Sequence, residues 1–243
     1  MAVLYDTIGL NYSELRKPDI RIAAQIDLVL GEAVSVLNVG AGAGSYEPMS
    51  RKVTAIEPSI EMIKQRPVSN VNVVQGSAES LPFEDNSFDA SMAILTIHHW
   101  SNQEAGIDEI LRVTRGPVVI LTFDPFANWF WLADYFPAFI ELDKQQMPPI
   151  SKFEEWFSEL AVKEVPIPDD CADGFLAAYW KRPHAYLDRR VRAAISSFSA
   201  IRDLSEGLAK LAKDLENGDW QQRYGYLLEQ NELDCGYRLI VGR

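Results

Sequence analysis

The chain has 243 residues, of which 47% are hydrophobic and 24% are charged, and its formal net charge is −12. This size and composition suit one large α/β domain with an apolar core. The acidic balance argues against a nucleic-acid partner, because affinity for phosphates comes largely from basic side chains. It favours a small-molecule ligand.

The sequence predicts a cytoplasmic protein with no membrane partner. The first twelve residues lack the basic and apolar segments of a signal peptide, and no window holds the roughly 18 apolar residues of a membrane span. Two cysteines that lie far apart, Cys171 and Cys235, are typical of free thiols in a reducing compartment. With three histidines and no Cys/His cluster, we expect no metal site.

Between residues 19 and 125, short apolar runs alternate with amphipathic stretches. This alternation predicts βαβ units and a doubly wound, mostly parallel sheet with helices on both faces. Such sheets bind ligands beyond the carboxyl ends of their strands, next to the first strand. The expected strands are 35–39, 53–57, 71–75, 90–96 and 118–123, and the expected helices are 20–30, 59–65 and 103–114.

The pattern changes after Pro125. An aromatic, proline-interrupted stretch is followed by a helix at 153–160, an edge strand at 162–168, several helices and a final strand at 235–243. We therefore interpret residues 1–243 as a single domain with a ligand-binding core at 19–125. Residues 126–150 and 171–230 form a predicted helical lid or substrate section.

The segment "VLNVGAGAGSYEP" places Gly40, Gly42 and Gly44 directly after a buried strand. Glycines there let the backbone turn tightly and approach a ligand. In the dinucleotide fingerprint the third glycine comes one residue later, at the position of Ser45, and a full helix then faces a pyrophosphate. Because Pro48 leaves room for little more than one helical turn, the pattern favours a nucleoside without phosphates over NAD or FAD.

Glu57, at the carboxyl end of the second strand, is placed to accept hydrogen bonds from both hydroxyls of a ribose. S-adenosylmethionine is a nucleoside of this kind. Two alternatives stay open: an NAD(P)-dependent oxidoreductase of the same fold, and a non-catalytic protein that binds S-adenosylmethionine.

Four motifs over about residues 34–125 together resemble the class I S-adenosylmethionine-dependent methyltransferases of the small-molecule "type 11" kind: "VLNVGAGAGSYE", "VTAIEPSIEMI", "VVQGSAESLPFEDNSFDASMAILTIHHW" and "EILRVTRGPVVILTFDP". The resemblance implies a Rossmann-like sheet of seven strands whose last strand is antiparallel. It also implies methyl transfer to a small organic acceptor, at an undetermined O, N or C atom, with S-adenosylhomocysteine as the product.

The resemblance further implies a set of cofactor-binding residues. An Asp usually stands at the positions of Asn38 and Ser77, so we expect a rearranged polar shell, with Asn38 still bracing the glycine loop. Gly40, Ala41 and Gly42 would line the methionine part, and Glu57 would hold the ribose. Pro58 and Met62 would lie against the adenine, with Ser77 and Ala78 at its amino edge. Leu95 and Thr96 would flank the sulfonium.

The acceptor side is expected to begin at "TIHHW". His98 or His99 could take a proton from the acceptor, because imidazole titrates near neutral pH. Aromatic and basic residues from three segments are candidates for contacts with substrate or for a lid. They are Tyr5, Tyr12 and Arg16, then Trp100, and then Trp129 and Trp131.

Overall fold

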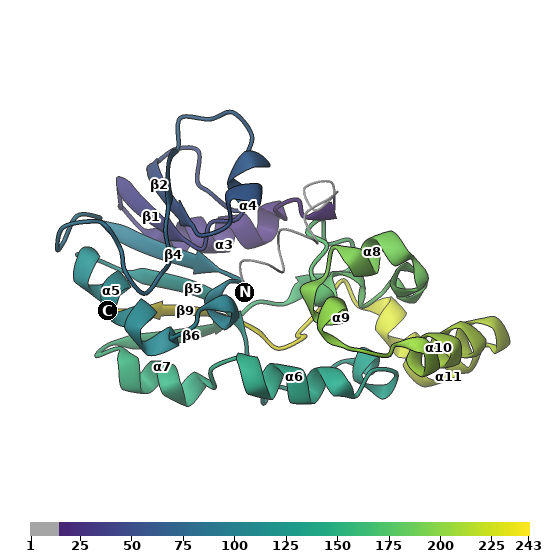
Figure 1. The fold of residues 1–243 in the computed structure, drawn as a ribbon. Helices are drawn as coiled ribbons and strands as arrows, with labels where there is room; N and C mark the ends of the chain where they lie inside the picture. Colours follow the sequence, from purple (N-terminus) through teal and green to yellow (C-terminus); the bar gives the residue numbers. More distant parts are fainter. Residues whose placement is uncertain (1–14) are drawn as a thin grey trace.

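The computed structural model describes residues 15–243, and a seven-stranded sheet lies at its centre (Figure 1). The strand order is β3-β2-β1-β4-β5-β9-β6; the first five strands are mutually parallel, and β9 is antiparallel to both of its neighbours. The prediction of a mostly parallel sheet with an antiparallel last strand is therefore confirmed. The strands are β1 (Ser35–Val39), β2 (Lys52–Glu57), β3 (Asn72–Gln75), β4 (Ala90–Ile94), β5 (Val118–Phe123), β6 (Leu160–Glu164) and β9 (Tyr237–Gly242).

Helices cover both faces of this sheet (Figure 1). On one face, α3 (Ile20–Leu30) buries apolar side chains spaced four residues apart, beginning with Ile22 and Ile26. On the other face lie α5 (Gln103–Val113) and α7 (Ile150–Trp156). The short α4 (Ile60–Lys64) follows β2, and the hydroxyl of its cap, Ser59, accepts from the Met62 amide.

Three predicted boundaries shift for local reasons. Strand β4 ends at Ile94, because Leu95 takes a left-handed backbone with a φ of 53°. Helix α7 ends at Trp156, because the amides of Ser158 and Glu159 already donate to the carbonyl of Arg243 at the end of the sheet. The edge strand expected over 162–168 is divided into β6 and a separate short strand.

That separate strand, β7 (Ile167–Pro168), pairs with β8 (Glu232–Leu233) in a small antiparallel ladder. The chain between them forms most of the helical section, which extends beyond one end of the sheet (Figure 1). The remaining helices are η1 (Ile97–His99), which follows β4, η2 (Trp131–Asp134) and α6 (Ala138–Gln146), and then η3 (Leu176–Tyr179), η4 (Pro183–Leu187), α8 (Arg189–Ala193), α9 (Ser196–Ala200), α10 (Ser205–Asn217), α11 (Asp219–Tyr224) and η5 (Gly225–Glu229).

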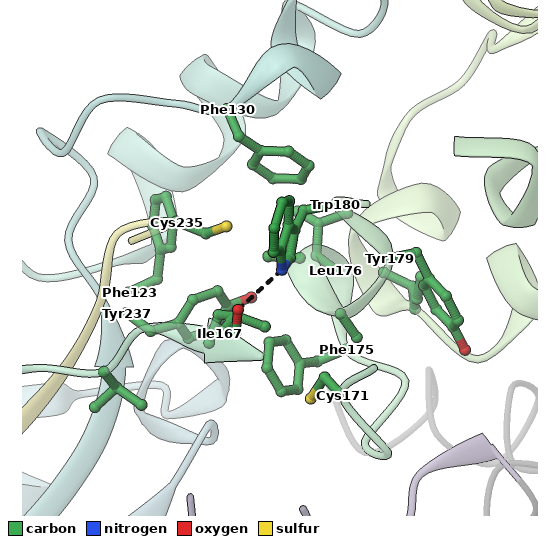
Figure 2. Close-up of a cluster of buried hydrophobic side chains, with 14 of the residues drawn as sticks. Phe123, Phe130, Ile167, Cys171, Phe175, Leu176, Tyr179, Trp180, Cys235 and Tyr237 are labelled. Atoms are coloured by element: carbon green, nitrogen blue, oxygen red, sulfur yellow. Dashed lines mark hydrogen bonds between the residues drawn. The ribbon is translucent and has the colours of Figure 1, made fainter. Parts of the chain in front are cut away.

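An aromatic cluster joins the helical section to the sheet (Figure 2). The indole nitrogen of Trp180 donates to the carbonyl of Ile167 at 2.9 Å, and that of Trp131 donates to the carbonyl of Trp180 at 2.6 Å. Trp129 packs against Phe123, with ring centroids 5.2 Å apart. Trp129 and Trp131 were candidates for contact with substrate or for a lid; the structure buries Trp131 in the core and packs the half-buried Trp129 against that core.

Three other expectations concern the cysteines, membrane spans and metal sites. Cys171 and Cys235 are both buried and unbridged. None of the helices within residues 15–243 combines the length and the apolarity that crossing a bilayer requires. In the same part of the chain, acidic, histidine and cysteine side chains form no group of three that could hold a metal ion.

The shared core can be tested with Phe139→Ala. Phe139, on α6, is fully buried against Phe136 and Phe198, so its truncation should lower the free energy of unfolding by about 3–5 kcal/mol in urea titrations. The control is Phe126→Ala, because Phe126 is 69% exposed and its loss should cost under about 0.5 kcal/mol. Similar losses in both variants would show that the helical section does not share the core.

Candidate functional site

A cavity of about 290 Å³ lies at the carboxyl ends of β1, β2 and β4. Every residue of the predicted cofactor set lines it, although the residues come from four separate segments of the chain. The sheet brings these segments together, because the carboxyl ends of neighbouring parallel strands meet at one edge. The predicted residues in its wall are Asn38, Gly40, Ala41, Gly42, Glu57, Pro58, Met62, Ser77, Ala78, Leu95 and Thr96.

The glycine loop forms the floor of this cavity. Gly40 and Gly42 have φ values of 68° and 53°, which glycine adopts at little cost. A Cβ added to Gly40 would lie 2.9 Å from the Cβ of Thr96, so the loop can lie against β4 only as glycine. The amides of Gly40 and Ala41 both donate to the carbonyl of Ile56, at 2.9 and 3.0 Å, which ties the loop to β2.

Glu57 lies at the end of β2 with its carboxylate in the cavity wall. One oxygen accepts from the Gly42 amide at 2.8 Å and the other from the Ser59 amide at 2.9 Å. The side chain is buried, and burial raises the pKa of the Glu57 carboxyl, while the two amides and the nearby Arg66 charge act in the opposite direction. Because a carboxylate offers about four acceptor positions, both oxygens keep capacity for a ligand.

A buried brace lies beneath the loop. The amide nitrogen of Asn38 donates to Glu47 Oε1 at 2.9 Å, and the guanidinium of Arg66 contacts both Glu47 oxygens at 2.7 and 2.6 Å. Arg66 also donates to the carbonyl of Gly42 at 3.1 Å. Sequence reasoning missed Glu47 and Arg66; the available signal was an acid just before Pro48 and an Arg just after α4.

The wall nearest β4 carries the two predicted histidines. His99 lines the cavity, whereas His98 lies behind it. Burial is the main cause that holds the pKa of His98 well below its ordinary value and lowers the pKa of His99 to about 4, and the positive charge of Arg16 adds to both shifts. Both imidazoles are therefore neutral at pH 7.

Trp100, a candidate for contact with substrate or for a lid, lies in the wall of the cavity. It lies against Gly106 of α5, where an added Cβ would come within 2.6 Å of the indole ring. Beyond it, Glu79 accepts from the amide and the hydroxyl of Ser101 at 2.7 and 2.8 Å. These bonds hold the segment after Trp100 against the loop that carries Ser77.

Arg16 also lines the cavity and is held by an ion pair with Asp173 at 2.6 Å. The hydroxyl of Tyr46, in the glycine loop, donates to the second oxygen of Asp173 at 2.9 Å. Asp173 thus joins the start of the described chain, the glycine loop and the helical section. Tyr5 and Tyr12, which were candidates for contact with substrate or for a lid, lie outside the described residues.

A second cavity of about 60 Å³ adjoins the first one, and Arg16, Leu95 and His99 line both. It lies between the sheet and the helical section, and its wall combines apolar and polar side chains. Sequence reasoning did not single out its acidic residue, Asp143 of α6. The other residues in its wall are His98, Thr122, Phe123, Met147, Phe175, Leu176, Ile195, Ser196, Ser197 and Tyr237.

The brace predicts that restoring the family's usual residue will harm this chain. Asn38→Asp replaces a donor by a carboxylate against Glu47, so we expect a loss of about 2–4 kcal/mol in unfolding free energy. Adding Glu47→Gln supplies a new donor and should recover at least half of that loss in urea titrations. If Asn38→Asp leaves stability unchanged, the brace does not hold the loop.

Comparison with known proteins agrees with this site. The family described as "Methyltransferase domain" matches residues 37–121. A crystal structure of a protein assigned as a methyltransferase of an antibiotic biosynthesis pathway in Anabaena variabilis is 37% identical, with a TM-score of 0.88, over 94% of this chain and 99% of that one.

More distant relatives share part of the chain or only the fold. A chloroplastic 2-methyl-6-phytyl-1,4-hydroquinone methyltransferase of Oryza sativa is 28% identical over 55% of this chain and 42% of its own length. The chain spans about two fifths of the length of the first curated relatives that it matches. A Haemonchus contortus phosphoethanolamine N-methyltransferase, solved with S-adenosylhomocysteine, shares the fold at 16% identity and a TM-score of 0.55, over 99% of this chain and 56% of that one.

The Anabaena protein carries the family assignment, because its identity to this chain extends over almost the full length of both. The matched family covers the same glycine loop, β2 end and β4 end that form the cavity. The chain belongs to the class I S-adenosylmethionine-dependent methyltransferases.

Proposed function

We propose that this chain transfers the methyl group of S-adenosylmethionine to a small organic acceptor. The observation that carries the proposal is Glu57, whose buried carboxylate lies beside a glycine loop in which a Cβ on Gly40 would collide with Thr96. The named relatives methylate or bind acceptors as different as a hydroquinone and a phosphomonomethylethanolamine. They support a small-molecule acceptor for this chain without fixing its identity.

The residues present fit the cofactor. Glu57 keeps acceptor capacity for two ribose hydroxyls, and Gly40 and Gly42 leave a cradle that a Cβ would fill. Pro58 and Met62 would pack against the adenine, and Ala78 would lie at its amino edge. Ser77, where an Asp is usual, would offer a shorter polar group to the same edge.

When bound, S-adenosylmethionine supplies a methyl group on a positively charged sulfur, which makes that carbon open to attack. The chain's own tasks are to align the acceptor with that carbon and to exclude water. Leu95 and Thr96 would hold the reacting end in place, and Leu95 does so from a strained backbone. The neutral His99 faces the cavity and could accept a proton from an acceptor that must lose one.

The geometry disfavours an NAD(P)-dependent oxidoreductase. Residues 40–51 form turns without a helix between β1 and β2, so no helix N-terminus is available there for a pyrophosphate. A non-catalytic protein that binds the cofactor is the second alternative. The adjoining cavity beyond His99 disfavours it, because a sensor needs no space for an acceptor.

Glu57→Ala should weaken the binding of S-adenosylmethionine at least tenfold in titration calorimetry, because the ribose hydroxyls lose their acceptor. Glu57→Gln keeps one acceptor oxygen, so its affinity for S-adenosylmethionine should lie between those of the unmodified protein and Glu57→Ala. This variant also guards against a loss of affinity caused only by misfolding. Glu61→Ala is the matched control, since Glu61 pairs with Lys64 on the surface. Unchanged affinity in Glu57→Ala would overturn the ribose assignment, and stabilisation by NAD(H) but not by S-adenosylhomocysteine would overturn the function.

The histidines should stay neutral under assay conditions. Because burial lowers the pKa of both imidazoles, neither His98 nor His99 should titrate between pH 5 and 8 in ring carbon–proton NMR spectra, with His99→Asn used for assignment. As the pH falls below their ordinary pKa of 6.5, the unfolded chain takes up protons that the folded chain does not, so stability should decline toward pH 4. A midpoint between 6 and 7 for the His99 signal would contradict the burial argument.

A further inference from the structure

The second cavity contains a buried acid that the proposed chemistry leaves unused. Asp143 is 4% exposed and lines this cavity from α6. It stands in the apolar row of that helix, four residues after the buried Phe139 and four before Met147. An acid in a row of apolar residues is costly, so its position calls for a partner.

The protein supplies no such partner within residues 15–243. No hydrogen bond or ion pair reaches the Asp143 carboxyl from the residues described, and burial alone raises its pKa to about 7. The cation in the same cavity, Arg16, is already paired with Asp173 at 2.6 Å. The other titratable groups that face the cavity are His98, His99 and Tyr237, and neither neutral imidazole compensates a negative charge.

Aromatic rings form much of the remaining wall. Phe123 and Tyr237 come from β5 and β9, and Phe175 comes from the segment before η3 (Figure 2). The ring of Tyr237 lies between the other two, with centroids 5.5 Å from Phe123 and 4.7 Å from Phe175. Aromatic faces attract cations, so the rings and the carboxylate favour the same kind of guest.

The size of the cavity limits that guest. A volume of about 60 Å³ corresponds to roughly four to six water molecules, at 10–15 Å³ for each. This is the space of a small alkyl or cyclic group. Because the cavity adjoins the cofactor cavity at Arg16, Leu95 and His99, the guest would lie next to the methyl group.

We infer that the second cavity is the acceptor site and that Asp143 selects acceptors carrying a small protonated amine, which it pairs with inside the aromatic wall. The inference rests on the proposed function for the role of acceptor, but the binding of an amine can be measured on its own. Asp143 then sets specificity: a neutral alcohol of the same shape can donate its O–H to the carboxylate but brings no positive charge, so the buried negative charge stays uncompensated.

The test compares cyclopentylamine with cyclopentanol, two probes of equal size, on protein saturated with S-adenosylhomocysteine. In NMR titrations at pH 8 we expect the amine to bind at least tenfold more tightly than the alcohol. Asp143→Asn should abolish the preference. Glu141→Gln, which removes an exposed acid from the same helix, should retain it.

The pH dependence gives a second readout that needs no variant. The amine preference of the unmodified protein should fade between pH 8 and pH 5, because the Asp143 carboxyl takes up a proton around pH 7 and loses its charge. Without ligand, Asp143→Asn should raise the melting temperature by several degrees at pH 8 and leave it unchanged at pH 4, where the carboxyl is neutral in the folded chain. The sign follows from a folded pKa above the ordinary 3.8, which costs stability as the pH rises.

The outcomes separate this inference from the proposed function. If S-adenosylhomocysteine fails to bind, the proposed function falls. If it binds but the two probes bind equally, or if the alcohol binds better, the amine site is overturned. A preference that persists in Asp143→Asn or at pH 5 also overturns it, because the selection would then come from another group.

Discussion

The site depends on a buried carboxylate at the end of a buried strand. Glu57 is shielded from water, and the amides of Gly42 and Ser59 compensate part of that cost. The same two bonds fix the glycine loop and the start of α4 relative to β2. A ligand that donates hydrogen bonds to Glu57 would therefore meet a loop that is already in place. Binding would then cost little further ordering of the loop.

The sheet and the cofactor cavity could largely be predicted from the sequence. Their signals are local: alternating apolar runs fix β1, β2 and β5 within one residue, and the glycine spacing marks the loop between β1 and β2. The parallel order then brings Glu57 and Thr96 to the same edge without any further information. Leu95 belongs to the predicted set and lines the cavity, but its left-handed backbone was not predicted, because that conformation at a branched residue follows from its surroundings and not from its own preference.

The acceptor side could not be predicted in the same way. Trp129 and Trp131 stand in an aromatic stretch that suggested a lid, but Trp131 is buried beside Trp180 and Trp129 packs half-buried against Phe123. From the sequence alone Asp143 is typical of a surface acid, but the fold buries the side of α6 that carries it. Glu47 and Arg66 form an ion pair but stand 19 positions apart in the sequence, so no short motif contains both. Each of these cases depends on packing between residues that are far apart in the chain, and such contacts cannot be predicted from one sequence alone.

The small ladder of β7 and β8 has a consequence for how such enzymes diversify. Ile167 pairs with Leu233 and Pro168 with Glu232, so the chain enters and leaves the helical section at one point. A segment with adjacent ends can be lengthened, shortened or exchanged without moving the strands that flank it. Selection could thus remodel the acceptor wall contributed by Phe175, Ile195 and Ser196 while the nucleoside half of the protein stayed constant.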